Sequence, residues 1–229
     1  MALSGEGAAC IWNDISDEAR DEFYAWHLGE HMPERVGIPG FRRGRRYIAV
    51  DQETSPEFFT LYETASPEVL VSQDYLARLN DPTPWTKRAT AGFRNTSRAL
   101  TRVHASYGPG PGGILATIRC CADADTPQAL RRALTLELLP RIAARPQITG
   151  AHLCLTNAGA SAAKTAESRD RTDILGAPEI VVLIEGCNPE PVRLALRECL
   201  DGSSLALSGA VPGLYRLEHT RLTTAHASG

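Results

Sequence analysis

The chain alternates short apolar segments with amphipathic ones. In the first half this pattern predicts a strand, a helix, two strands joined by a polar turn, a second helix and a closing strand. The first helix begins with acidic residues, as the helix dipole favours, and Pro33 and the Pro39-Gly40 turn limit its length. The predicted ranges are, in this order, 8–13, 17–36, 41–50, 57–64, 66–79 and 99–105.

The second half repeats the same succession of patterns. Glu57-x5-Glu63-x3-Pro67-Glu68 recurs 122 positions later as Glu179-x5-Glu185-x3-Pro189-Glu190, and Glu30-x2-Pro33 recurs 107 positions later as Glu137-x2-Pro140. The larger offset reflects an insertion of 12 residues within Asn157 to Pro178, which is predicted to form an exposed loop. The predicted ranges of this half are 114–120, 127–144, 151–156, 179–184, 189–200 and 214–222.

The repeated order of elements predicts an α+β fold made of two tandem ferredoxin-like β-α-β-β-α-β units. We expect the first unit at residues 1–106, a Gly/Pro linker at 107–113 and the second unit at 114–229. In such a unit the helices cover only one face of the sheet, so the other face needs a partner. The other unit can supply it, which predicts two sheets packed face to face within one chain.

Composition narrows the classes of function. The 229 residues are 43% apolar and carry a net charge of −3 without any long basic tract, which argues against nucleic acid as a partner. The apolar runs are far shorter than a membrane helix, and residues 1–9 lack the features of a secretory signal. The six cysteines show no C-x-x-C spacing, so neither a zinc site nor a disulfide scaffold is indicated. We therefore expect a cytoplasmic protein that binds a small molecule and no membrane.

One segment of the first half resembles a known superfamily. Trp26-x3-Glu30-His31-x-Pro33, followed by Pro39-Gly40-Phe41 and Arg45-Arg46-Tyr47, is similar to the dimeric α/β-barrel superfamily, and within it to the EthD-like proteins and uncharacterised bacterial relatives. The resemblance implies a single-chain barrel, either a monomer with an internal pseudo-dimer or a homodimer. It also implies a pocket between each sheet and its own helices. Because the superfamily includes haem enzymes, it makes haem an alternative to a cofactor-free site.

Two histidines distinguish the first copy from the second. His27 and His31 lie four residues apart on the predicted helix, hence on one face, whereas the second copy has Leu134 and Leu138 at these places. The repeated unit therefore does not need imidazoles in order to fold. His31 is the candidate general base or acid, with His27 or Glu30 assisting. The structural alternatives are that His31 caps the helix end and that His27 is a surface residue.

Tyr62 and Arg46 are candidates for stabilising negative charge. Tyr62 stands where the second copy has Ile184, so its hydroxyl could donate to a developing enolate oxygen. Arg46 could bind a carboxylate or phenolate in a bidentate manner if its side of the strand faces the pocket. Core packing of Tyr62 and surface ion pairing of Arg46 are the alternatives. The residues expected to line a substrate pocket are Trp12, Asn13, Phe23, Trp26, Tyr75 and Trp85.

These residues favour a cofactor-independent small-molecule enzyme of catabolism or secondary metabolism. It would be an isomerase, lyase or cyclase that acts on an apolar or aromatic carbonyl compound by proton transfer. Two alternatives stay open, namely a haem-binding or accessory protein of an oxidative pathway and a non-catalytic binding or interaction module. A bound metal is not expected, because the histidine pair has no identifiable third ligand.

Overall fold

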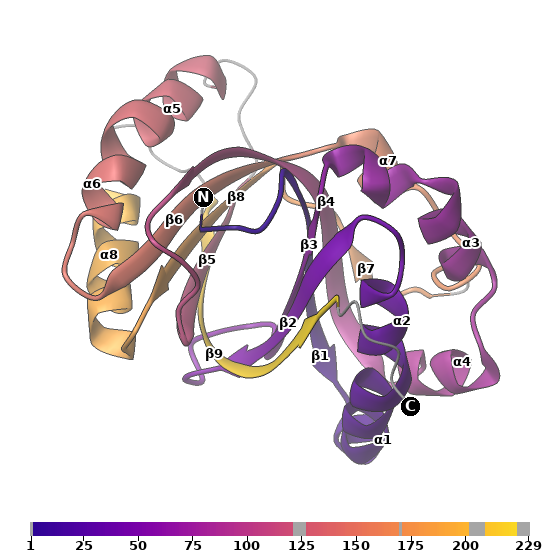
Figure 1. Ribbon diagram of the computed structural model, residues 1–229. Helices are drawn as coiled ribbons and strands as arrows, with labels where there is room; N and C mark the ends of the chain where they lie inside the picture. Colours follow the sequence, from indigo (N-terminus) through magenta and orange to yellow (C-terminus); the bar gives the residue numbers. More distant parts are fainter. Residues whose placement is uncertain (1, 121–126, 170, 202–208, 224–229) are drawn as a thin grey trace.

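The described chain forms an antiparallel barrel with helices packed against its outside (Figure 1). The computed structural model describes residues 2–120, 127–169, 171–201 and 209–223. The strands are β1 (Gly7–Ile15), β2 (Phe41–Ala49), β3 (Phe58–Thr64), β4 (Phe93–Tyr107), β5 (Ile114–Cys120), β6 (Ile148–Thr156), β7 (Ile174–Leu175), β8 (Ile180–Gly186) and β9 (Val211–Leu222). Around the barrel they run β1-β3-β2-β9-β5-β8-β6-β4, and β4 pairs again with β1, which closes the ring.

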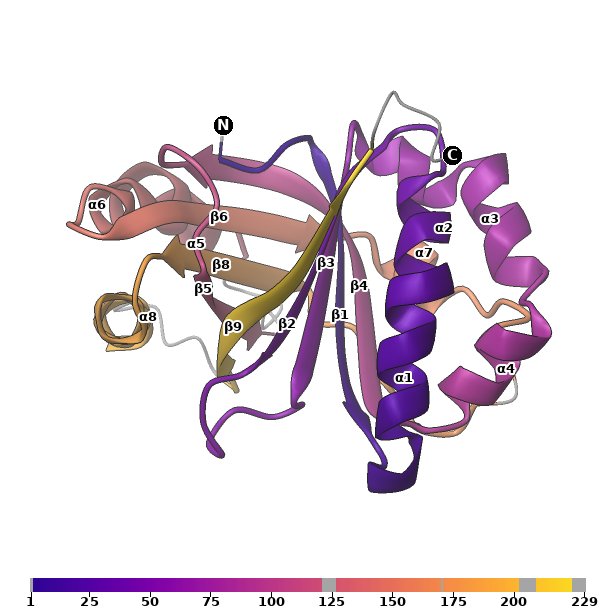
Figure 2. The same cartoon turned by 60° about the horizontal axis from the view of Figure 1, so that its bottom comes forward.

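The helices lie in two groups on opposite sides of this barrel (Figure 2). In the first half they are the 3₁₀ turn η1 (Asp17–Ala19), α1 (Arg20–Trp26), the π-helical turn η2 (His27–His31), α2 (Met32–Val36), η3 (Pro67–Val71), α3 (Gln73–Asn80) and α4 (Pro84–Thr90). In the second half, α5 (Pro127–Ala133), the π-helical turn η4 (Leu134–Leu138), α6 (Leu139–Ala143) and α8 (Pro189–Asp201) form the other group, whereas α7 (Ala158–Ala162) lies beside the helices of the first half. Among the described residues, no helix combines the length and the apolar character needed to cross a bilayer.

Two antiparallel strand pairings join the two halves around the barrel. Within the first half the spatial order is β2-β3-β1-β4, and within the second it is β6-β8-β5-β9. The last strand of each half pairs with the second strand of the other, because β4 pairs with β6 and β9 pairs with β2. The expected α+β class and the barrel are therefore confirmed. A duplication as the origin of the two halves, and the domain boundaries drawn from it, stay predictions.

Both halves widen their first helix at the same place. The π-helical turns His27–His31 and Leu134–Leu138 are 107 positions apart, and Pro33 or Pro140 follows each of them within two residues. Inside an α-helix, proline cannot donate a hydrogen bond and clashes with the carbonyl four residues earlier. A π-turn bonds across five residues, as Met32 N–H does to the carbonyl of His27, and this widening accommodates the proline ring.

Two features of the first half differ from the sequence prediction. The strand β4 begins at Phe93 rather than at residue 99, and α4 was not predicted at all. This helix has a capped start, because the Thr83 hydroxyl accepts a hydrogen bond from Thr86 N–H and Pro84 occupies the first helical position. The turn that begins α4 is therefore encoded in the sequence, although the helix is too short to show an apolar period.

The insertion of the second half is exposed over much of its described length, as predicted, but it is not only a loop. It contains α7, whose cap Asn157 accepts a hydrogen bond from Ala160 N–H, and the short strand β7, which runs parallel to β4. Thr165 is buried, and Glu167 N–H donates to the carbonyl of Leu79. The insertion thus crosses over to the first half and packs against its helices, an outcome that depends on contacts remote in sequence.

Side chains fill the interior of the barrel. Trp12, Tyr47, Phe59 and Tyr215 are fully buried there in one apolar cluster. Their neighbours on the same strands point outward, because successive side chains of a strand alternate between faces. A ligand space inside the barrel is therefore excluded by packing, and space for a small molecule has to lie between a sheet and its helices.

A buried ion cluster connects the two halves within this interior. Arg45 donates to Glu63 of its own half and to both carboxylate oxygens of Glu185 from the other half. Arg43 also binds Glu63 with two hydrogen bonds, and His152 Nε2 lies 3.4 Å from Glu185 Oε1. The two carboxylates are the repeated glutamates of the sequence pattern. The cluster balances their charges, which is the condition for burying them.

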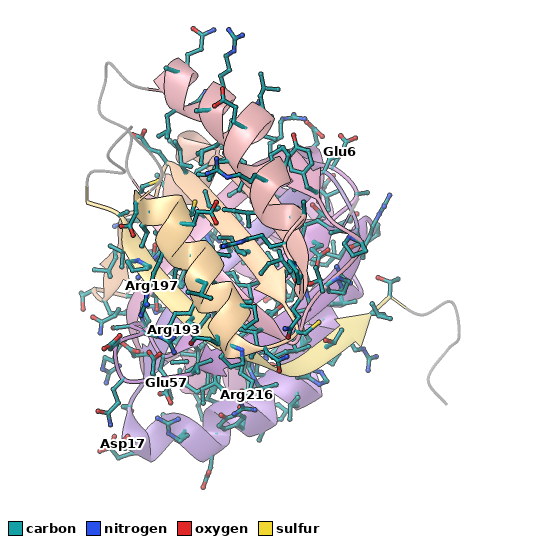
Figure 3. The ribbon with its side chains drawn as sticks, turned by 90° about the vertical axis from the view of Figure 1, so that its left-hand side faces the viewer. Glu6, Asp17, Glu57, Arg193, Arg197 and Arg216 are labelled. Atoms are coloured by element: carbon teal, nitrogen blue, oxygen red, sulfur yellow. The ribbon has the colours of Figure 1, made fainter. Side chains whose placement is uncertain are left out.

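The outer face of the second half is packed with aliphatic side chains. Figure 3 shows α8 and the α5–α6 helix lying over this face. Leu134, Leu138, Leu139 and Ile142 from the first of these helices join the strand residues in a single cluster, to which α8 adds Val192 and others. The space beneath these helices is therefore filled by aliphatic side chains.

Arg45→Ala should lower the free energy of unfolding by about 3–5 kcal/mol, because it leaves two buried carboxylates without their shared partner. Urea denaturation at pH 7 measures this change. The matched control is Arg216→Ala, which removes an exposed arginine of β9 (Figure 3) and should change the stability by less than about 0.5 kcal/mol. Equal stability of the two variants would contradict the role given to Arg45.

The same cluster should make the protein sensitive to acid. Burial alone would raise the pKa of Glu185, but Arg45 and the nearby His152 outweigh burial and hold the pKa at about 2. A carboxyl whose pKa is lowered by folding stabilises the fold above its unfolded-state pKa, so this contribution is lost as the pH falls from about 5 towards 2. Urea denaturation across that range should show a decline that is weaker in Arg45→Ala.

Candidate functional site

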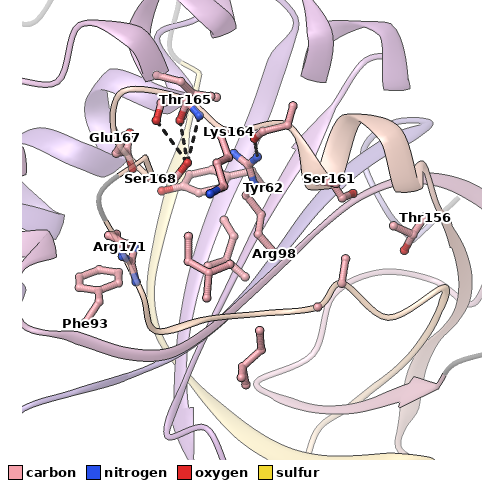
Figure 4. A pocket seen from close by; sticks show the side chains of 18 of the residues that line it. Tyr62, Phe93, Arg98, Thr156, Ser161, Lys164, Thr165, Glu167, Ser168 and Arg171 are labelled. Atoms are coloured by element: carbon pink, nitrogen blue, oxygen red, sulfur yellow. Dashed lines mark hydrogen bonds between the residues drawn. The ribbon is translucent and has the colours of Figure 1, made fainter.

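A cavity of about 520 Å³ lies between the outer face of the first sheet and its helices. Its floor comes from β1, β3 and β4, through Ile11, Tyr62 and Arg98. One wall comes from the helices, through His31 and Tyr75 among others. The roof comes from the insertion of the second half, where side chains such as those of Ser161, Lys164 and Ser168 lie around the same space as Tyr62 and Arg98 (Figure 4). Both halves of the chain therefore build this one site.

His31 presents a neutral imidazole to the cavity. Its ring packs against that of Trp26, with the ring centroids 4.3 Å apart, and its Nδ1 atom is fully buried without a hydrogen-bond partner in the described chain. Burial lowers the pKa of His31 well below its ordinary value, and the positive charge of Arg35 and the neighbouring His27 lower it further. At physiological pH the ring is therefore uncharged and able to accept a proton.

Tyr62 supplies a hydroxyl without a partner beside this histidine. The two ring centroids are 6.2 Å apart, and no described group lies within hydrogen-bond reach of the buried Tyr62 hydroxyl. Burial raises its pKa, so the phenol stays protonated and acts as a donor. A Cβ atom on Gly44 would lie 2.9 Å from the Tyr62 ring and 2.2 Å from Met32 Sδ. Glycine at this position therefore allows the helix and the tyrosine to pack closely.

Arg35 ties the roof of the cavity to its wall. It is buried on α2 and forms ion pairs with Glu34 of the same helix and with Glu167 of the insertion. Burial opposes the charge of Arg35, but Glu167, Tyr75 and Glu34 raise its pKa above the ordinary value. The guanidinium therefore keeps its charge inside the site and lowers the pKa of His31 from there.

His27 and Arg46, two further candidates, lie together outside the cavity. Arg46 Nη1 is 3.5 Å from His27 Nδ1, and Arg46 Nε donates to Glu218 at 3.1 Å. The guanidinium also lies over the ring of Tyr24, whose hydroxyl donates to the same Glu218. The substrate role predicted for Arg46 is therefore not supported by its position, because its partner is a carboxylate of β9.

Glu30 acts on the site through Trp26. Its carboxylate accepts hydrogen bonds from the hydroxyls of Thr83 and Thr86, and Thr86 in turn accepts one from Trp26 Nε1. The chain of hydrogen bonds fixes the indole against which the ring of His31 packs. Glu30 is thus placed to hold α4 against the first helix and not to exchange protons with a ligand in the cavity.

The predicted pocket residues divide into two groups. Trp26 and Tyr75 line the cavity together with His31 and Tyr62. The others lie elsewhere. Trp12 is inside the barrel and donates to Thr117, and Asn13 donates to the carbonyl of Asp14. Phe23 of α1 packs in an apolar cluster with Ile15 and Phe58, and Trp85 packs against that cluster. Successive side chains of β1 point to opposite faces of the sheet, so Trp12 points into the barrel while its two neighbours face the helices.

Among the charged residues of the cavity that were not predicted from the sequence are Arg35, Arg98 and Lys164. Arg35 lies one helical turn after His31 and on the same side of the helix, which is a signal that the sequence contained. Arg98 lies in the part of β4 that the predicted strand did not include, and Lys164 lies in the insertion. Only the fold shows that Arg98 and Lys164 line the same cavity.

No family model and no curated protein matches the sequence. Solved structures do match the fold: an anthrone oxidase-like protein has a TM-score of 0.63 at 10% identity, covering 97% of this chain and 95% of that chain. A proposed monooxygenase from Lactobacillus acidophilus has a TM-score of 0.58 at 8% identity, covering 95% and 96%. The chain has the fold of the ferredoxin-like dimeric α/β-barrel proteins.

A third dimeric α/β-barrel structure, a chlorite dismutase variant from Candidatus Nitrospira defluvii, has a TM-score of 0.50 at 9% identity, covering 92% of this chain and 91% of that chain. At identities this low the likeness shows the fold alone. The nearer EthD-like relationship that the helix motif suggests stays a prediction.

The residues of the cavity do not fit a haem group. Of the histidines that the structure describes, only His31 borders the cavity. A histidine that binds a metal almost always donates its second ring N–H to a carboxylate, a carbonyl or water, but the buried His31 Nδ1 has no such partner in the described chain. We therefore derive no step through haem. Within the described ranges, no three His, Cys, Asp or Glu side chains are grouped to hold a metal ion.

Replacing His31 by the leucine of the second half should stabilise the protein. His31→Leu removes a buried polar atom without a partner, which should raise the free energy of unfolding by about 1 kcal/mol at pH 7.5. The gain should be larger at pH 5.5, because the unfolded chain takes up a proton near pH 6.5 that the folded histidine, with its lowered pKa, does not. Urea denaturation at the two pH values measures both effects.

The matched control is the reverse exchange. Leu138→His places an imidazole in the aliphatic cluster of the second half and should destabilise the fold by about 1–3 kcal/mol. If His31→Leu instead loses more than about 2 kcal/mol, the histidine serves the fold and the site loses its main argument.

Proposed function

We propose that this chain is a cofactor-independent enzyme that takes a proton from a carbon acid, namely an apolar or aromatic carbonyl compound bound in the cavity. The observation that carries the proposal is the pairing of a neutral buried imidazole, His31, with a protonated buried hydroxyl, Tyr62, neither of which has its polar atom satisfied in the described chain. Leaving buried polar atoms unpaired costs stability. Unpaired polar atoms of this kind are typical of sites where a bound ligand supplies the missing hydrogen bonds.

The two groups have complementary roles in this reaction. The C–H bond next to the carbonyl breaks, the proton moves to the imidazole of His31, and the electron pair moves onto the carbonyl oxygen to give an enolate. Tyr62 donates a hydrogen bond to that oxygen. General base catalysis contributes roughly 10²–10⁴-fold to a rate, and a donor aimed at a developing oxyanion roughly 10²–10³-fold.

The low pKa of His31 is compatible with this role. The free site resists the imidazolium ion because His31 is buried and because Arg35 lies nearby. When the enolate forms, its negative charge stabilises the imidazolium, so the two charges arise together. The protonated His31 then returns the proton to another carbon, or the enolate expels a leaving group or closes a ring. These three outcomes correspond to an isomerase, a lyase and a cyclase.

The second half is the scaffold for this site in our proposal. It has leucines in place of both histidines and Ile184 in place of Tyr62, and these aliphatic side chains are packed in its core. The π-helical turns at equivalent positions support a tandem duplication, because such turns are rare and both copies have one. The first copy has then acquired the proton-transfer groups, while the second, apart from its insertion, has kept only the packing.

Oxidation by dioxygen is the second candidate outcome. An anthrone oxidase-like protein and a proposed monooxygenase share the fold, and an enolate is a carbanion that can give two electrons to dioxygen. For anthrone the balance is one anthrone and one dioxygen giving one anthraquinone and one water. Proton abstraction by His31 is the first step of this route as well, so the two candidates differ only in what consumes the enolate.

Exchange of carbon-bound hydrogen tests the common step. The protein should accelerate the incorporation of deuterium into 2-tetralone in D₂O under nitrogen, as followed by proton NMR. His31→Gln should slow the enzyme-dependent exchange by about 10²–10⁴-fold and Tyr62→Phe by about 10²–10³-fold. His104→Gln, on an exposed part of β4, is the control and should keep the wild-type rate.

The pH profile adds a second readout. A base works in its deprotonated form, and the pKa of His31 lies well below its ordinary value, so the exchange rate should stay level from neutral to weakly acidic pH and fall only in stronger acid. Exchange at the wild-type rate in His31→Gln would refute the catalytic assignment. No exchange by any variant would favour a binding module, and a Soret band in the purified protein would favour haem. Oxygen uptake with anthrone separates the oxidative outcome.

A further inference from the structure

Two cations at the cavity have no counter-charge. Arg98 projects from β4 and Lys164 from the insertion, and Figure 4 shows both close to Tyr62. Nη2 of Arg98 makes one long hydrogen bond, 3.4 Å, to the carbonyl of Ala163. In the part of the chain that the structure describes, no carboxylate forms an ion pair with either residue. A guanidinium has five N–H donors, so most of the donors of Arg98 are available to a ligand.

The other charges of the lining are already matched. Arg35 is bound by Glu34 and Glu167, and Arg171 is bound by Asp173 while it lies over the ring of Phe93. Glu179 also belongs to the lining, where its side chain is exposed. Arg98 and Lys164 are therefore the lining cations without an ion-pair partner in the described chain, and they lie where the insertion meets β4.

The remaining lining is apolar or aromatic. Ile11, Trp26, Tyr75, Leu79 and Phe93 contribute to it beside His31 and Tyr62, whose buried Nδ1 and hydroxyl have no partner in the described chain. A ligand that satisfies all of these surfaces has an apolar ring system for the wall, a carbonyl group for Tyr62 and an anionic group for the two cations. Arg98 prefers a planar two-oxygen anion, because the guanidinium matches a carboxylate with two parallel hydrogen bonds.

We propose that the cavity binds an aromatic or apolar carboxylic acid, with its carboxylate held between Arg98 of the first half and Lys164 of the second. The proposal rests on the proposed function and deepens it, because it names the class of substrate on which His31 and Tyr62 act. The insertion then takes part in binding, because a bound carboxylate links the roof of the cavity to its floor. The same contact orients the reacting carbon towards His31.

Two probes of the same shape test the charge preference. Isothermal titration calorimetry at low ionic strength should give a dissociation constant for 2-naphthoate at least about tenfold lower than that for the neutral 2-naphthamide, the size expected for hydrogen bonds to a charged group. Arg98→Gln should remove most of this ratio, and Lys164→Gln should reduce it about two- to fivefold because Lys164 is exposed.

The control is Arg94→Gln on the same strand. Arg94 is exposed and donates only to the main-chain carbonyls of Ala91 and Phe93, outside the cavity lining. This variant should keep the wild-type ratio of the two dissociation constants. Lys164→Gln provides an independent test should Arg98→Gln fail to fold.

The remaining outcomes test the carboxylate site and the proposed function separately. Equal affinity for the two probes, no binding of either, or an unchanged ratio in both Arg98→Gln and Lys164→Gln would overturn the carboxylate site. His31→Gln should keep the ratio while it loses hydrogen exchange. If the ratio holds but wild-type exchange does not differ from that of His31→Gln, the carboxylate site stands and the proposed function fails.

Discussion

Arg45 lies between two carboxylates from opposite halves of the chain, and the organisation of the molecule follows from that contact. The ion cluster and the aromatic side chains around it fill the barrel interior, so strand residues that face inward serve the fold. Any space for a ligand is displaced to the outer faces, where helices cover the sheets. Of these two faces, the second is closed by aliphatic packing, whereas the first contains a cavity with polar groups.

The first helix of each half carries different side chains at the same two positions. A proline forces both copies into a wide turn, and the turn places its first and last side chains against the sheet. In one copy these side chains are leucines and complete a core. In the other they are histidines, of which His27 is held by Arg46 while His31 reaches the cavity. The same backbone therefore supports aliphatic packing in one copy and, in the proposed function, proton transfer in the other.

Much of this arrangement could be predicted from the sequence, because it follows from local patterns and from the internal repeat. The order of elements, the closed pairing of two sheets and the contrast between His31 and Leu138 all come from residues that can be compared along one chain. The faces of the strands could not be assigned, since alternation separates Trp12 from its neighbours without showing which side is the interior. The roof could not be predicted either. Residues 157–178 have no period, and Arg35, Arg98 and Lys164 meet only through tertiary contacts.

The origin of the roof in the opposite half has an evolutionary consequence. Changes in the length or composition of this loop alter which molecules are admitted without touching the helix that bears the reactive imidazole. They also leave the strands that carry the ion cluster intact. Under the proposed function, selectivity and reactivity are thereby encoded in separate stretches of the gene, so that descendants of one ancestor can diverge in substrate while they retain a common reaction.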